Sequence, residues 1–407
     1  MASRPLYRLD SLTLSNSGLI LNPSSNRQQN GRHGNNHTNT GVSAKCPYPD
    51  ERLLVSCAGL LFSLLYSSLS SRAVSRSLKR NIDMTIGFLH QKSAFGNELL
   101  KSLRIKLPKQ ELLSWIAGED PPARDIEFLL AMGPVARKQM VELTKLAFIQ
   151  TTSAGFENVD LDAASELGIW VSSAPSGATG NAASVAEFAI LLLLAASRRL
   201  GTVLKLESGH DFHPTQVHPS LSGKTVCIVG LGSIGEQIVE RLRPFAVTIV
   251  ATDEHPENAP PDVKAYSPDR LDEAVADSDF VVLCVPASKA NENLINAHVL
   301  HAMKRGAILV NIARGTLVDE QALIAAVKEG QISAGGLDVV RNEPLAASDP
   351  LFQFPQLVVT PYIAGFTDLM LHGTIDYISQ VIEQVAANQK PKSILNLPES
   401  PRRMLRD

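Results

Sequence analysis

The sequence predicts an α/β protein with two doubly wound parallel sheets, and three observations lead to this fold class. Short, β-branched apolar runs recur along the chain, as in strands that are buried on both faces. Helical stretches separate these runs, which is typical of parallel sheets with crossover helices. One run, Thr225–Val229, leads directly into a glycine-rich turn and a helical repeat. Strands are expected at 84–89, 126–132, 146–152, 169–172, Thr225–Val229, 247–252, 280–285, 307–312, 336–339 and 357–360.

The turn after Thr225–Val229 has glycines at the three positions of a dinucleotide-binding fingerprint. Gly230 allows a tight turn, Gly232 lets the backbone approach a pyrophosphate, and Gly235 lets the helix lie close to the strand. Ser233 and Ile234 would begin the helix, so that its first N–H groups face the phosphates. An ordinary glycine-rich turn is the alternative, and the strand–turn–helix order favours the dinucleotide site.

A carboxylate ends the next expected strand. Asp253 lies about twenty residues past the glycines, where an acidic side chain binds the ribose 2′-hydroxyl and repels a 2′-phosphate. Glu254 adds a second carboxylate, and no Lys or Arg lies within several residues. The sequence therefore predicts NAD as the cofactor, with NADH preferred over NADPH.

Length and composition limit the remaining possibilities. The 407 residues suggest two domains and a tail, and a hydrophobic share of 44% is normal for a globular protein. A net charge of −3 gives no argument for binding nucleic acid, and membrane association is not expected. The four cysteines show neither metal-ligand spacing nor a disulfide framework, so no metal is expected. These features favour a reduced, cytoplasmic enzyme.

Residues 1–83 differ from the rest of the chain. They are rich in Ser and Asn, and we expect a disordered or targeting tail there. An apolar run at 53–69 is short and serine-rich for a membrane span. Three interpretations stay open, in this order of preference: a dispensable tail or a start assigned too far upstream of Met84, an organellar transit peptide, and a membrane anchor.

Residues 185–194 form the most apolar helical stretch. A helix that is apolar on all sides must be buried, so this one is expected between domains or subunits. Further helices are expected at 161–167, at Glu320–Lys328 and at about 368–388.

Six motifs, in this order along the chain, resemble those of the D-isomer-specific 2-hydroxyacid dehydrogenase family. They are a substrate-loop pattern at 152–160, a hinge-helix pattern at 180–187, the glycine turn at 230–235, Val-Asn-Ile-Ala-Arg-Gly at 310–315, Gly-Leu-Asp-Val at 336–339 with Asn-Glu-Pro at 342–344, and Thr-Pro-Tyr-Ile-Ala-Gly at 360–365. The resemblance extends from about Met84 to the C-terminus.

The resemblance implies a domain arrangement and an activity. Residues 84–180 and 366–400 would form a flavodoxin-like substrate domain, into which a Rossmann NAD-binding domain at 181–365 is inserted. The chain would be a homodimer that transfers hydride between NAD(H) and a small 2-oxo acid or D-2-hydroxy acid of glyoxylate, hydroxypyruvate or 3-phosphoglycerate type. The alternative from another class is an NAD-sensing binding protein with weak or no catalysis.

By this resemblance, Arg314 is catalytic and binds the substrate. A guanidinium at the carboxyl end of a strand holds the carboxylate and carbonyl oxygens of a 2-oxo acid, and it stabilises the negative charge that grows as hydride arrives. An isolated arginine would more often pair with a surface carboxylate. Backbone N–H groups of Ser153, Ala154 and Gly155 would complete the carboxylate site, although a plain strand-to-helix turn also explains this glycine.

Five further residues are implied in cofactor binding. Asp338 would hold the nicotinamide carboxamide, with a turn aspartate as the ordinary alternative. Val285 and Pro286 would pass under the adenosine, or simply end their strand. Ile312 and Ala313 complete this set.

The family's catalytic glutamate corresponds to Glu343, whose partner there is a histidine after Thr-Pro. Here the residue after Thr-Pro is Tyr362, so the proton donor departs from the family pattern. A phenol titrates at about pH 10, so it is protonated at neutral pH and suits an acid better than a base. Tyr362 is therefore predicted to be the catalytic acid, and packing beside the nicotinamide is the alternative. His298, His301 and His372 do not replace the missing histidine by spacing.

Overall fold

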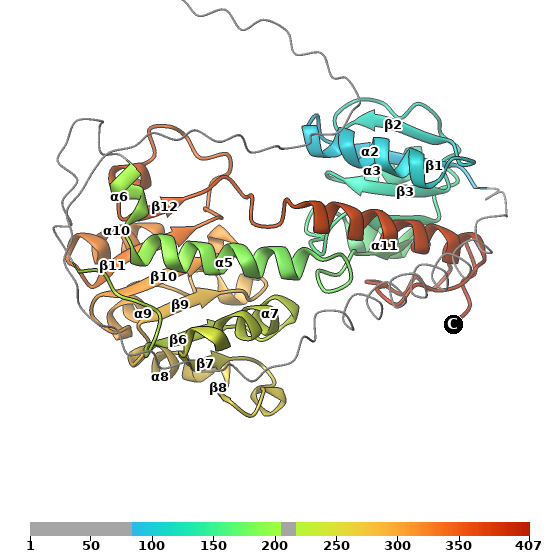
Figure 1. Ribbon diagram of the computed structural model, residues 1–407. Helices are drawn as coiled ribbons and strands as arrows, with labels where there is room; N and C mark the ends of the chain where they lie inside the picture. Colours follow the sequence, from blue (N-terminus) through green and yellow to red (C-terminus); the bar gives the residue numbers. More distant parts are fainter. Residues whose placement is uncertain (1–83, 205–216) are drawn as a thin grey trace, which may run out of the picture. The chain divides into compact units, whose positions relative to one another are not determined.

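The computed structural model describes residues 84–204 and 217–407, which lie within one compact unit. The expectations for residues 1–83, including the apolar run at 53–69, lie outside these residues. The described strands form a five-stranded and a seven-stranded sheet, both parallel throughout (Figure 1). The predicted fold class is therefore confirmed.

The strands are β1 (Ile86–His90), β2 (Leu112–Ile116), β3 (Phe128–Met132), β4 (Phe148–Thr151), β5 (Trp170–Ser172), β6 (Thr225–Val229), β7 (Thr248–Thr252), β8 (Val263–Tyr266), β9 (Phe280–Leu283), β10 (Ala307–Asn311), β11 (Ile332–Leu337) and β12 (Leu357–Val359). The α-helices are α2 (Ala94–Lys106), α3 (Arg137–Glu142), α4 (Leu161–Glu166), α5 (Asn181–Ser197), α6 (Leu200–Leu204), α7 (Ser233–Leu242), α8 (Leu271–Ala276), α9 (Ala297–Ala302), α10 (Glu320–Lys328) and α11 (Asp368–Ala386).

The five-stranded sheet has the order β2-β1-β3-β4-β5, which is the flavodoxin-like order. Successive side chains of a strand point to opposite faces, and both faces are covered. Phe88 and Phe128 pack with residues of α2 and α11, whereas Leu89 and Leu129 pack with residues of α3 and α4. Helix α11 follows the second sheet in sequence but belongs to the core of the first. The part of the chain that forms the seven-stranded sheet is thus inserted into the domain built on the five-stranded sheet.

The seven-stranded sheet has the order β12-β11-β10-β9-β6-β7-β8. Val226 and Ile228 of β6 pack on the side of α5 and α7, and Cys227 and Val229 pack on the side of α8, α9 and α10. Strand order reverses at β6, between β7 and β9. Open parallel sheets bind dinucleotides at the carboxyl ends of the strands beside such a switch point. The glycine turn follows β6 and therefore lies there.

Helix α5 lies along β10 and β11 and against α7 (Figure 1). Its close approach requires glycine in β11, because a Cβ on Gly336 would lie 2.8 Å from Cβ of Leu192. The strand β11 begins at Ile332, earlier than the predicted 336–339. The prediction missed its beginning because glycines at 335 and 336 interrupt the apolar pattern. The expectation that α5 is buried on all sides holds only in part, because the side chain of Leu191 is 50% exposed.

Two strands have no counterpart among the sequence predictions. Both β2 and β8 lie at sheet edges, and each has partly exposed residues between buried ones. A continuous apolar run identifies central strands and misses such edges. Among the described residues, no helix has the length and apolarity needed to cross a membrane.

Candidate active site

The glycine turn has the close contacts that the fingerprint requires. Gly230 has a φ of 102°, in the left-handed region that favours glycine. A Cβ on Gly235 would lie 2.1 Å from the carbonyl oxygen of Gly230, so α7 can lie this close to β6 only with glycine there. The Cys284 thiol donates a hydrogen bond of 3.0 Å to the same carbonyl. Burial raises the pKa of this thiol, so it stays neutral and can keep donating.

Helix α7 begins differently from five of the other described helices. Side chains cap the N-termini of five helices, namely Ser93 for α2, Asp160 for α4, Asn296 for α9, Asp319 for α10 and Thr367 for α11. Gly232 precedes α7, and no described side chain caps it. The first N–H groups of any helix lack acceptors within the helix. Those at the start of α7, near Ser233 and Ile234, therefore remain available to an anion.

Asp253 ties the end of β7 to this turn. Its Oδ2 accepts a hydrogen bond of 2.8 Å from the N–H of Leu231, and its Oδ1 accepts one of 2.9 Å from the N–H of His255. The carboxylate is thus fixed beside the glycine turn while remaining partly exposed.

The loop after β10 is organised by Asn311, which the sequence analysis did not single out. The buried Asn311 side chain donates to the carbonyl of Arg314 at 2.9 Å and accepts from the N–H of Ala313 at 3.0 Å. Ile312 and Ala313 are buried in this loop, and Arg314 follows at its end. Asn311 could have been identified from the sequence, because it is the polar residue that ends an otherwise apolar strand.

Arg314 lies beside the loop after β4. Its Nη1 donates to the carbonyl of Ala313 at 2.8 Å, and its Nη2 lies 3.3 Å from Oε1 of Glu157. A Cβ on Gly155 would lie 3.1 Å from the same Nη2. The structure therefore brings together Arg314 and the loop of Ser153, Ala154 and Gly155, as the family resemblance implies. Within residues 84–204 and 217–407, the N–H groups of these three loop residues donate no hydrogen bond to the protein.

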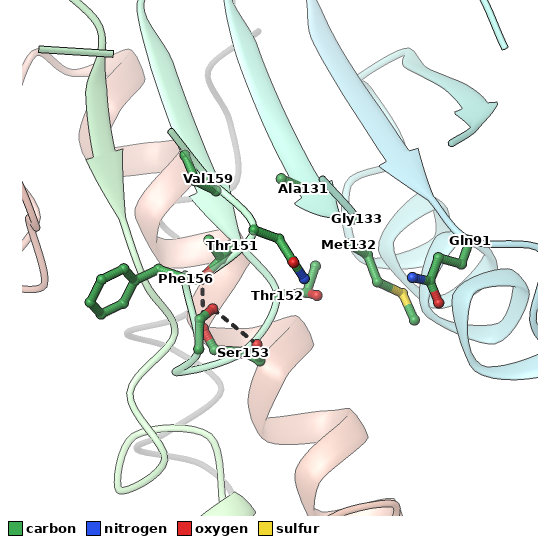
Figure 2. A pocket seen from close by; sticks show the side chains of 11 residues that line it. Gln91, Ala131, Met132, Gly133, Thr151, Thr152, Ser153, Phe156 and Val159 are labelled. Atoms are coloured by element: carbon green, nitrogen blue, oxygen red, sulfur yellow. Dashed lines mark hydrogen bonds between the residues drawn. The ribbon is translucent and has the colours of Figure 1, made fainter. Parts of the chain in front are cut away.

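A cavity of about 160 Å³ opens on the same loop. Figure 2 shows Ser153 and Phe156 on one side and Met132 and Gln91 on the other. The hydroxyl of Thr151 donates to the carbonyl of Ser153 at 2.6 Å and fixes the loop. Met132 and Gln91 were not among the sequence-predicted site residues. Their positions at the carboxyl ends of β3 and β1 could have identified them from the sequence, because open parallel sheets bind ligands there.

Asp338 holds the loop that carries Tyr362. Its Oδ1 accepts hydrogen bonds from the hydroxyl of Thr360 at 2.7 Å and from the N–H of Ile363 at 2.9 Å. Its Oδ2 accepts from the N–H of Ala364 at 2.9 Å. Both oxygens of this buried carboxylate are thus engaged by the protein, as in the turn aspartate that was the ordinary alternative.

Tyr362 is exposed, and its ring contacts an aromatic side chain. Its ring meets that of Phe366 edge to face, with the centroids 6.5 Å apart, and Phe366 meets Phe95 of α2 in the same way at 5.0 Å. Glu343 is exposed and accepts a hydrogen bond of 3.1 Å from the N–H of Val340. In the part of the chain that the structure describes, Glu343 makes no hydrogen bond to Tyr362. Val285 and Pro286 come one residue after β9, and Val285 lies beside Gly230.

The other histidines considered are exposed. His298 and His301 lie on α9, where His298 pairs with Asp272 at 2.8 Å, and His372 lies on α11. Within the described ranges, none of them makes a hydrogen bond or an ion pair with Arg314 or Tyr362.

Comparison with known protein sequences identifies related enzymes. Residues 190–364 match the NAD binding domain of the D-isomer specific 2-hydroxyacid dehydrogenases. The chain is 31% identical over 301 residues to D-3-phosphoglycerate dehydrogenase of Methanocaldococcus jannaschii, covering 74% of this chain and 56% of that protein. It is 34% identical over 284 residues to glyoxylate reductase of Thermofilum pendens, covering 67% of this chain and 82% of that protein. The chain thus spans about half the length of the phosphoglycerate dehydrogenases that it matches.

Solved structures show the same fold. An NADPH-dependent glyoxylate/hydroxypyruvate reductase from Sinorhizobium meliloti, in complex with NADP and malonate, superposes with a TM-score of 0.66 at 26% identity. The alignment covers 79% of this chain and 99% of that one. D-2-hydroxyisocaproate dehydrogenase, at 23% identity, has a TM-score of 0.67 over 76% of this chain and 99% of that chain, and supports the fold alone.

Proposed function

The chain belongs to the D-isomer-specific 2-hydroxyacid dehydrogenase family, and from this premise we propose that it is an NAD-dependent oxidoreductase acting on a small 2-oxo acid or D-2-hydroxy acid. The observation that carries the proposal is the contact of Arg314 with the loop of Ser153, Ala154 and Gly155. The guanidinium of Arg314 lies beside a loop with three N–H groups that donate no hydrogen bond within the described part of the protein. This donor set fits the carboxylate and carbonyl oxygens of a 2-oxo acid.

The residues at the carboxyl ends of β6 and β7 fit a dinucleotide. The uncapped start of α7, at Ser233 and Ile234, supplies N–H groups for the pyrophosphate, and Gly232 has no atom within 4 Å of its Cβ position. Asp253 has a carboxylate fixed beside this turn for the ribose hydroxyls. When NADH is bound, it supplies the hydride. We assign Val285 and Pro286 to the adenosine side, and Ile312, Ala313 and Asp338 to the nicotinamide side.

Arg314 and Tyr362 have separate roles in binding and reducing the 2-oxo acid. Arg314 holds the acid and stabilises the negative charge that develops on its C2 oxygen. Tyr362 donates the proton that this oxygen then takes, because a phenol is protonated at neutral pH. Glu343 lies in the neighbouring loop, and its role is to orient the proton donor.

We also propose the arrangement around this chemistry. Residues 84–180 and 366–400 form the substrate domain, and residues 181–365 form the NAD-binding domain. Two copies of the chain associate as a homodimer in the cytoplasm. Apolar side chains of α5 and the adjoining α6 support this: Leu191 is 50% exposed, Leu200 39% and Val203 43%.

The experiment is to follow NADH oxidation by the full chain with glyoxylate, hydroxypyruvate and pyruvate, and then to repeat it with NADPH. We expect turnover with NADH and a much lower kcat/KM with NADPH. Arg314→Met should lower kcat/KM by about 100- to 1,000-fold, because it removes the charged donors from the reacting oxygens.

The matched control is Arg305→Met, since Arg305 is exposed and donates to the carbonyl of Glu329. This variant should keep the parent rate. A protein that binds NADH tightly but reduces no 2-oxo acid would instead be an NAD-sensing binding protein.

A further inference from the structure

We propose that this protein selects 2-oxo acids whose third carbon carries no phosphate, and that Met132 and Gln91 make this selection. The inference rests on the proposed function and names its substrate class. Sequence identity to the relatives does not distinguish the two substrate types. The phosphoglycerate dehydrogenases and the glyoxylate reductases match this chain at similar levels of 31–34%. The side chains of the cavity provide the distinction.

The cavity that opens on the substrate loop has no cationic lining. Its eleven lining residues, all within the described chain, include no Lys, Arg or His. Gln91 and Met132 form the side farther from the loop of Ser153 and Phe156 (Figure 2). They lie at the ends of neighbouring strands, since His90 of β1 pairs with Met132 of β3 and Gln91 follows His90 directly. A substituent that extends from the acid across the cavity would therefore meet an amide and a thioether.

Charged groups near the cavity do not compensate for this lining. Arg314 reaches the loop at Gly155, where we assign it to the substrate carboxylate and carbonyl. Glu157 lies 3.3 Å from the same guanidinium and adds a negative charge on that side. Lys92 follows Gln91 in an exposed turn and does not line the cavity. The N-terminus of α2 is capped by Ser93, which accepts the N–H of Gly96 at 3.1 Å.

A phosphate group needs cationic side chains, and the lining of this cavity has none. Phosphates are bound by Arg or Lys side chains or by uncapped helix N-termini, and a charge buried without such partners is strongly disfavoured. A hydroxyl group, by contrast, can exchange hydrogen bonds with the Gln91 amide. The cavity therefore accepts a hydroxymethyl or smaller substituent and rejects a phosphorylated one.

The test compares two product acids on the full chain saturated with NAD⁺. Isothermal titration should show binding of D-glycerate and at least about 100-fold weaker binding of 3-phosphoglycerate. Turnover is measured separately, with hydroxypyruvate and its phosphorylated counterpart as substrates and NADH as reductant. Equal or tighter binding of 3-phosphoglycerate, or no binding of D-glycerate, overturns the inference. Loss of turnover with the binding preference retained would contradict the proposed function and leave the selectivity standing.

Variants at the cavity wall provide a gain-of-binding test. Met132→Arg places a guanidinium in the wall and should tighten 3-phosphoglycerate binding at least tenfold relative to Met132→Leu, which keeps the apolar character. Gln91→Lys is the second variant and should act in the same direction if Met132→Arg fails to fold, as judged by thermal unfolding. The affinity for 3-phosphoglycerate is compared with that for D-glycerate in each variant. If folded Met132→Arg or Gln91→Lys protein shows the same ratio as Met132→Leu, these positions do not select the substrate.

Discussion

Tyr362 has a backbone conformation that residues with a side chain rarely adopt. Its φ of 56° lies in the left-handed region, which costs about 1–2 kcal/mol for a residue other than glycine. Asp338 offsets this cost, because its carbonyl accepts the N–H of Tyr362 at 2.9 Å and its carboxylate accepts those of Ile363 and Ala364. Backbone strain of this kind clusters at functional sites.

Replacing Tyr362 by Phe tests its role as the acid. The change removes the hydroxyl and keeps the ring that meets Phe366. We expect kcat for 2-oxo acid reduction to fall by about 100-fold, with NADH affinity unchanged, because positioned acid catalysis contributes at least this much. Steady-state kinetics and NADH titration measure the two effects. Reduction at the parent rate would show that water or Glu343 supplies the proton. Tyr377→Phe removes a hydroxyl that bonds to Ser393 instead, and serves as the control.

At the scale of elements, the two ends of the parallel strands have different roles. The candidate site residues follow the carboxyl ends of β4, β6, β7, β9, β10, β11 and β12. Asp279 lies at the opposite, amino end of the second sheet and connects its strands. It accepts the N–H of Thr225 at 3.0 Å and the ammonium group of Lys304 at 2.7 Å, and Lys224 lies 3.8 Å away.

The pKa of Asp279 is lowered in the folded protein. Burial of the carboxyl group opposes ionisation, but hydrogen bonds from Lys304 and Thr225 and the charges of Lys304 and Lys224 outweigh it. A carboxyl whose folded pKa lies below its unfolded value stabilises the protein above the unfolded pKa of about 3.9. That contribution is lost as the pH falls through the folded pKa.

Asp279→Asn should therefore lower the free energy of unfolding by about 1–3 kcal/mol at neutral pH. The difference from the parent should be constant above about pH 5 and should shrink as the pH falls below about 4. Urea unfolding at several pH values measures it. Asp277→Asn is the control, because Asp277 is exposed and its side chain makes no hydrogen bond within the described ranges. A difference that does not change with pH would mean that the carboxylate charge at 279 contributes nothing.

At the scale of the whole molecule, exposed apolar side chains on α5 and α6 are the basis for the proposed dimer. Single exposed apolar residues are ordinary, but adjoining helices that expose several of them indicate a contact surface. Leu191 projects from a helix whose other apolar residues are largely buried against the seven-stranded sheet and α7.

Leu191→Asp should convert the dimer to a monomer, since a charge would then be buried at the contact without a partner. Sedimentation velocity of the full chain should give a dimer for the parent and a monomer for this variant. Ile105→Asp is the matched control, because Ile105 of α2 is 72% exposed and lies outside this surface. A parent protein that sediments as a monomer contradicts the dimer.

The sequence by itself determined most of the central strands and the nucleotide-binding turn. Both depend on residues that are close together in sequence. Apolar runs mark strands buried on both faces. A tight strand–turn–helix connection leaves no room for side chains at Gly230 and Gly235. Motif order was sufficient to indicate the family. Glycines 335 and 336 and the half-exposed edges at β2 and β8 weakened the pattern, so the beginning of β11 and both edge strands were missed.

Only the tertiary structure decided how the candidate site is assembled. Arg314 and Gly155 are far apart in sequence, and the packing of the folded chain brings them together. The structure also showed that Asp338 engages the loop of Tyr362 through both carboxylate oxygens, and that Met132 and Gln91 give the cavity a neutral wall. Such contacts join loops at the ends of different strands. Their geometry follows from strand order and side-chain packing, which the local pattern of the sequence does not contain.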